Sequence, residues 1–174
     1  VRSTEPDYSK RWLLHTAREP QIDDATVMAD QGEGRLFCRT LLPAEPVLTP
    51  IGGEGRRFMA GGRNWPVPEG VEVTEMMGWG RVEVTAPEER AQQNFLHVLQ
   101  TADLDREAMD AVERIDAEGT VGARISADDQ TIEISFATEG EIGGHIRIVR
   151  ADEVLVDRDL TADVQPQEGL EIPQ

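Results

Sequence analysis

Short alternations of apolar and polar residues run through most of the chain and constrain its fold more than any other feature. Glycine and proline interrupt the sequence at short intervals, and the apolar residues between them recur mostly at every second position. That spacing is typical of β-strands with one buried face. The sequence therefore predicts an all-β fold of about ten to twelve strands with little helix, arranged as two stacked antiparallel sheets in a β-sandwich or supersandwich-like architecture.

The strands are expected where the alternation is clearest. They cover residues 11–16, 26–30, 35–41, 80–85, 94–100, 121–126, 131–138, 145–150 and 153–160. The glycines of QGEG at residues 31–34 can adopt the positive φ of a hairpin, so the strands on either side are predicted to pair. Residues 105–116 place Ala108, Met109 and Val112 at spacings of three and four, which predicts a turn of helix leading into a strand.

A segment rich in glycine and proline, residues 50–70, is expected to be a long excursion with one short strand around Phe58. It holds or adjoins the candidate carbohydrate-contacting side chains, Trp65, Trp79, Arg56, Arg57, Arg63 and Asn64. Exposed aromatic rings with planar hydrogen-bond donors nearby suit the C–H face and the hydroxyls of a sugar. The alternative is that both tryptophans close one end of the sandwich while the arginines balance an acidic surface.

Length and charge limit the class of protein. The chain has 174 residues, which suits one domain, and we expect a polar leader at 1–10, a single sandwich domain at 11–164 and a flexible tail at 165–174. It carries 34 acidic and 17 basic residues, for a net charge of −17. A field of that sign repels phosphate backbones and anionic lipids, which argues against nucleic acid and membrane surfaces as partners. The beginning VRSTEPDYSK has neither Met nor a signal segment, so the chain is expected to be a piece of a longer protein.

Three histidines are the only imidazoles that could act as a base near neutral pH. His15, His97 and His145 lie far apart in the sequence, and no HExxH, GxSxG or phosphate-loop motif accompanies them. No catalytic residue is therefore predicted. His15 and His97 are interpreted as histidines packed on apolar strands, with the alternative that His15 gives one ligand to a metal held mainly by groups outside the chain. His145 is expected to be a solvated strand residue, and Cys38, the only cysteine, a buried small hydrophobe.

Five segments occur in an order that carries more information than any one of them. They are KRWLLHTAREPQID (10–23), GRLFCRTLLP (34–43), IGGEGRRFMAGGRNW (51–65), GWGRVEVTAP (78–87) and NFLHVLQTAD (94–103). This series resembles the β-rich C-terminal part of the heparinase II/III-like polysaccharide lyases. The resemblance covers about residues 10–103 and continues more loosely through the later strands.

The resemblance implies an enzyme in which an N-terminal α/α toroid is joined to stacked antiparallel sheets and which cleaves uronic-acid-containing polysaccharides by β-elimination. In that family the tyrosine and histidines that move the proton belong to the toroid side, whose segments are absent from this chain. The chain alone is therefore expected to be inactive. Its implied partners are the toroid of the same protein and a polysaccharide, and its implied location is periplasmic or extracellular.

Several lyases of this family also hold a structural zinc with one histidine from the sheet domain. The resemblance assigns that role to His15, although no bound metal or other cofactor is expected in this chain. Two rival functions remain open. A self-sufficient carbohydrate-binding module predicts that Trp65 or Trp79 is exposed on a concave face, and a structural or adhesion sandwich without a sugar ligand is favoured if both are buried.

Overall fold

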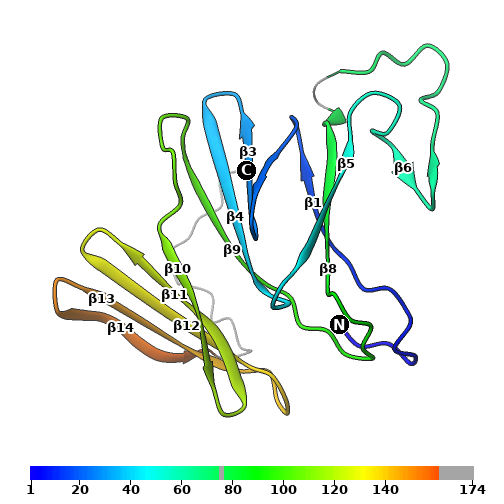
Figure 1. Ribbon diagram of the computed structural model, residues 1–174. Coiled ribbons are helices and arrows are strands. Elements are labelled where there is room, and N and C mark those ends of the chain that lie inside the picture. The colour runs from blue at the N-terminus through cyan, green and yellow to red at the C-terminus, as the bar shows by residue number, and fades with distance from the viewer. Residues whose placement is uncertain (75–76, 161–174) are drawn as a thin grey trace, which may run out of the picture. The chain divides into compact units, whose positions relative to one another are not determined.

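The computed structural model describes residues 1–74 and 77–160 (Figure 1). Fourteen strands and no α-helix lie in these residues, and each strand runs antiparallel to those it pairs with. In chain order the strands are β1 (Trp12–Thr16), β2 (Gln21–Asp23), β3 (Thr26–Gln31), β4 (Gly34–Leu42), β5 (Val47–Gly52), β6 (Met59–Ala60), β7 (Arg63–Asn64), β8 (Gly80–Thr85), β9 (Leu96–Asp103), β10 (Ala111–Ala117), β11 (Thr120–Ala127), β12 (Gln130–Ala137), β13 (Gly144–Arg150) and β14 (Glu153–Leu160). The predicted all-β class with antiparallel sheets is confirmed.

Contacts within the chain divide it into two compact units, Val1–Met109 and a second unit that begins at Asp110. The leader predicted at 1–10 belongs to the first unit, where the backbone N–H of Ser3 donates to the carbonyl of Ala91 at 2.8 Å. The predicted single domain over 11–164 spans both units and stays a prediction. The tail predicted at 165–174 lies outside the described residues.

The first unit contains a sandwich of two sheets (Figure 1). One sheet has the order β1-β8-β5 and the other β2-β3-β4-β9, while β6 and β7 form a separate two-stranded hairpin. Val27 and Cys38 from the second sheet pack against Val82 from the first, and all three are almost completely buried. Trp12, Leu14, Ile22 and Leu48 surround this cluster. Burial of each large apolar side chain stabilises the fold by about 1.5–3 kcal/mol relative to leaving it exposed.

His97 lies inside this sandwich, as its apolar strand predicted. Its ring stacks on Trp12 of the facing sheet with 3.8 Å between centroids, and its Nδ1 lies 3.1 Å from Oγ1 of Thr40. The Nε2 atom is buried without a hydrogen-bond partner among the described residues. Because burial disfavours the charged imidazolium, the pKa of His97 is lowered to about 4.

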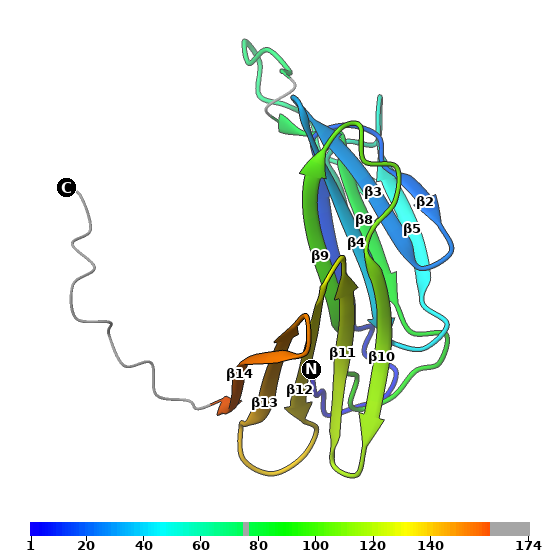
Figure 2. The ribbon, with the colours of Figure 1, turned by 90° about the vertical axis from the view of Figure 1, so that its left-hand side faces the viewer.

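The second unit is a five-stranded meander in the order β10-β11-β12-β13-β14 (Figure 2). Its register places apolar side chains opposite one another in rows, such as Ile125, Ile132 and Ile148. The neighbouring row on the other face is charged and alternates in sign, with Glu113, Arg124, Glu133, Arg147 and Asp157. The alternation read from the sequence is thus the separation of an apolar face from a polar face.

Two predictions about local structure are wrong. The expected turn of helix in 105–116 is absent, and β10 begins at Ala111 after a loop, because pairing with β11 along the whole strand outweighs a weak helical periodicity. The excursion begins after Gly52, not at Pro50, because residues 47–52 form β5. Among the described strands it pairs only with β8, and an edge strand tolerates Pro50 because a proline N atom there need not donate.

Candidate functional site

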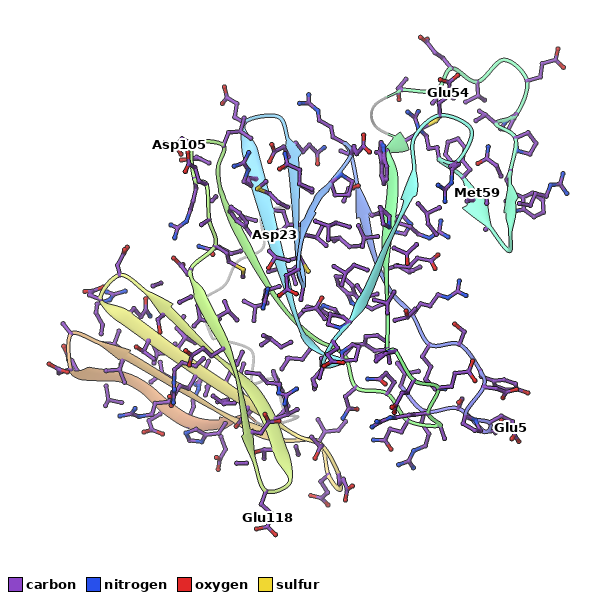
Figure 3. All side chains as sticks on the ribbon, in the orientation of Figure 1. Glu5, Asp23, Glu54, Met59, Asp105 and Glu118 are labelled. Atoms are coloured by element: carbon purple, nitrogen blue, oxygen red, sulfur yellow. The ribbon has the colours of Figure 1, made fainter. Side chains whose placement is uncertain are left out.

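A groove of about 810 Å3 lies over the outer face of the β1-β8-β5 sheet. The antiparallel register sets Leu13 opposite Glu83 and His15 opposite Arg81, and these four outward side chains form part of its floor. The excursion after β5 supplies one wall, which includes Arg57–Gly61. Figure 3 marks Met59 on this excursion, beside the sheet. The groove therefore joins a rigid strand pair to a segment that the sequence singled out.

A buried carboxylate lies at the centre of this floor. The side chain of Glu83 is only 8% exposed, although it points away from the sandwich core. Its Oε1 accepts hydrogen bonds from Nε and Nη2 of Arg81, at 2.9 and 2.5 Å, and its Oε2 accepts from Nη1 of Arg11 at 3.1 Å. Two guanidinium groups thus compensate the desolvation of one carboxylate.

The groove is cationic within an acidic chain. Among the described residues that line it, Arg11, Arg57 and Arg81 accompany one carboxylate, that of Glu83, so the formal balance of these residues is +2 with His15 neutral, against −17 for the whole sequence. Among the described residues no ion pair involves Arg57. A concave site of this sign attracts anions even when the protein as a whole repels them.

Trp65 is the exposed aromatic residue among the carbohydrate-contacting candidates. The residue is 52% exposed, the guanidinium carbon of Arg63 lies 4.6 Å from its ring centroid, and its Nε1 donates to the carbonyl of Ala60 at 3.3 Å. Asn64 acts within the hairpin, because its Oδ1 accepts a hydrogen bond from the backbone N–H of Phe58 at 3.0 Å. The contacts of Arg63, Asn64 and Trp65 thus lie within the hairpin, and their role as carbohydrate contacts stays a prediction.

A second, apolar hollow of about 510 Å3 lies beside Trp65. Its lining is Phe58, Trp65, Pro66, Val67, Pro68, Val71 and Met77. Phe58 and Met77 also line the cationic groove, so the two hollows share part of their walls. An apolar platform next to a cationic groove suits a ligand with alternating apolar and anionic parts.

Trp79 and Arg56 do not line the groove. Trp79 packs on the end of the first sheet, where a Cβ added to Gly52 would lie 2.4 Å from its ring, and its backbone N–H donates to the carbonyl of Thr16 at 2.8 Å. This is the alternative role that the sequence left open for the tryptophans, and at Trp79 it holds. Arg56 is exposed on the excursion, and only its neighbour Arg57 reaches the groove.

His15 is exposed in the groove and is directly opposite Arg81. The carboxylate on this floor, Glu83, is already bound by two arginines, and a nearby guanidinium opposes a cation. Within residues 1–74 and 77–160, no cluster of three or more His, Cys, Asp or Glu side chains is arranged to bind a metal ion. The residues around His15 therefore do not by themselves form a zinc site, and its role as one ligand of a shared site stays a prediction.

A charged cluster on the second unit was not predicted from the sequence. His145 was expected to be merely solvated, but its Nδ1 lies 2.9 Å from Asp159 and its Nε2 2.8 Å from Asp157. The hydrogen bond to Asp159, followed by that to Asp157, raises the pKa of His145 above its usual value. The DRD spacing at residues 157–159 was the available signal, but using it required the register of β13 and β14.

Comparison of the sequence with protein-family models and with curated proteins found no match. In the part of the chain that the structure describes, no helix has the length and apolar character needed to cross a membrane.

Proposed function

We propose that the chain is the non-catalytic β-sheet part of a heparinase II/III-like polysaccharide lyase. In this proposal the sandwich braces the α/α toroid of the same protein, and the excursion after β5 closes one wall of the substrate cleft. The observation that carries the proposal is the cationic groove, whose described lining residues have a balance of +2 in a chain of −17 and which is walled by the excursion.

The chemistry of the groove supports an acidic polysaccharide as the ligand of the whole protein. A uronate presents a planar carboxylate, which a guanidinium such as that of Arg57 binds in a bidentate manner. The pyranose ring presents an apolar C–H face, and the exposed ring of Trp65 offers a surface for it. Glu83 does not repel the substrate strongly, because Arg11 and Arg81 neutralise it.

The described residues also support a division of labour with another part of the protein. β-Elimination requires a base that abstracts a proton and an acid that delivers one. His97 is a weak base, because burial lowers its pKa to about 4. His15 lies in the groove, but Tyr8, the only tyrosine of the chain, does not line it, so no tyrosine accompanies His15 there. The groups that transfer the proton are therefore proposed to lie on the toroid.

Arg57 provides the sharpest test in the longer protein that this proposal requires. Arg57→Gln is expected to raise the KM for a uronate polysaccharide about tenfold, the loss of one charge-assisted contact. Arg56→Gln is the matched control, because Arg56 is adjacent in sequence but does not line the groove. Equal effects of the two substitutions on the KM would contradict the proposal that the groove binds the substrate.

A self-sufficient carbohydrate-binding module is the second candidate, and the 52% exposure of Trp65 favours it. That function predicts saturable binding of oligosaccharides by the 174-residue chain alone, followed by tryptophan fluorescence. Trp65→Ala would abolish the binding and Arg57→Gln would change it little. A pure brace gives no saturable change, so the titration separates the two candidates.

A further inference from the structure

One arginine connects the sheet to the excursion. Nη1 of Arg81 donates a hydrogen bond to the backbone carbonyl of Met59 at 2.6 Å, while Nε and Nη2 of the same side chain donate to Glu83. Met59 begins β6, so the bond reaches the hairpin formed by β6 and β7. Among the hydrogen bonds of residues 1–74 and 77–160, it is the side-chain bond that links the sheet to this hairpin.

The burial of this ion pair is unusual for its place. The side chains of Arg81 and Glu83 are 15% and 8% exposed, on the face of the sheet that points away from the core. A buried ion pair contributes little net stability compared with apolar residues of the same size, because desolvation offsets the attraction between the charges. What such a pair supplies is a fixed direction for its donors.

The shape of guanidinium explains why the residue is an arginine. Its planar group bears donors on several edges, so one side chain can bind the carboxylate of Glu83 and the carbonyl of Met59 at the same time. A lysine ammonium is a compact donor that lacks this fork. Glu83 fixes the orientation of the guanidinium, and Arg11 occupies the remaining oxygen of Glu83.

We propose that Arg81 is a positioning residue which, oriented by Glu83, holds the β6–β7 hairpin over the groove and thereby sets the positions of Arg57 and Trp65. The importance of this position for substrate rests on the function proposed above, whereas the position of the hairpin does not. The proposal adds to that function a mechanical link from the central strand β8 to the wall of the cleft.

Replacement of both partners separates positioning from stability. Arg81→Met together with Glu83→Met removes the link without leaving an unpaired buried charge, so the melting temperature is expected to stay within a few degrees of that of the wild type. Spin labels on Ala60→Cys in the hairpin and Val47→Cys on β5 report the distance between the hairpin and the sheet. Cys38 does not interfere, because it is buried and its pKa is raised to about 11.

The expected result is a narrow distance distribution in the labelled parent and one at least twice as broad in the double variant. Arg11→Met is the matched control, since Arg11 binds Glu83 but does not contact the hairpin, and its distribution should equal that of the parent. Arg81→Lys keeps a cation beside Glu83, so it folds even if the double variant does not, and it should also broaden the distribution. Unchanged distributions in the folded variants would overturn the proposal.

A kinetic measurement ties the link to the proposed function. In the longer lyase, Arg81→Lys is expected to raise the KM for the polysaccharide at least fivefold with kcat within a factor of two. If the longer protein shows no lyase activity, the proposed function fails while the label distances still decide whether Arg81 positions the hairpin. If activity is present and KM does not change although the hairpin is mobile, the link has no role in binding.

Discussion

Arginine and carboxylate side chains meet on both units of this protein, but under different conditions. On the first unit, Glu83 is 8% exposed and binds two arginines and, through Arg81, a hairpin. On the second unit, a row of five charged residues crosses the meander in alternating sign, and its side chains are between 29% and 70% exposed. Exposed ion pairs contribute about 0–1 kcal/mol, whereas breaking a buried pair costs about 3–5 kcal/mol. Burial, and not the presence of opposite charges, thus distinguishes the Arg81–Glu83 pair on the floor of the groove from the charged row of the second unit.

The histidines His97 on the first unit and His145 on the second also differ in burial. His97 is enclosed between the sheets and resists protonation, while His145 lies between two aspartates and favours it. Protonation of its histidine is therefore expected to destabilise the first unit and to stabilise the second. Because all three tryptophans, Trp12, Trp65 and Trp79, belong to the first unit, their fluorescence reports on that unit alone.

The largest effect is expected when the buried pair of the first unit is broken from one side. Glu83→Leu leaves Arg81 without its carboxylate and should lower the free energy of unfolding, measured by urea unfolding, by about 3 kcal/mol. Glu133→Leu is the matched change on the second unit, where Glu133 pairs with the half-exposed Arg124, and should cost less than about 1 kcal/mol. A similar loss of stability for the two substitutions would contradict the distinction between the buried ion pair and the exposed ones.

Acid should destabilise the first unit through His97. The folded-state pKa of about 4 lies below the unfolded value near 6.5, so the unfolded state binds the proton first. The neutral His97 ring therefore contributes to the free energy of unfolding above pH 6.5. This contribution falls by about 2 kcal/mol as the pH drops to 4, once partial exposure of the ring is allowed for. Urea unfolding followed by tryptophan fluorescence measures this slope, and His97→Phe should flatten it. A slope that survives the substitution would assign the effect to other groups.

The smallest effect belongs to His145 on the second unit. Its raised pKa means that its contribution to stability is present below the unfolded pKa and is lost as the pH rises through the folded pKa, opposite to His97. A proton NMR titration should give His145 an imidazole pKa above 6.5, which Asp159→Asn lowers. An ordinary pKa of His145 in the wild type would show that the two aspartates do not stabilise its protonated form.

The strands of high alternation could be read from the sequence because each has one apolar face, as in β8 and in β11 to β14. Pro50 concealed β5, since a proline in a strand can be accommodated only at an edge and the edge is defined by the pairing of other strands. The burial of His97 was predictable from its apolar neighbours, but its stacking on Trp12 requires the facing sheet.

The candidate site was only partly predictable for the same reason. The excursion and its exposed Trp65 were visible as a break in the pattern. The charges of Arg81 and Glu83 were also visible, two residues apart in GRVEVT, where spacing two normally indicates a solvated face. Their burial depends on the return of residues 57–61 over the sheet, a contact between segments about 20 residues apart that no local pattern encodes.

Whether this chain is the non-catalytic part of a longer lyase can be measured by the release of unsaturated uronate products, followed by absorbance, from a uronic-acid-containing polysaccharide. The 174-residue chain and a longer protein that includes the coding region before Val1 should be compared at equal concentration. We expect no product from the chain alone and sustained turnover from the longer protein. Turnover by the chain alone, or a preceding region that encodes no helical domain and adds no activity, would contradict the account.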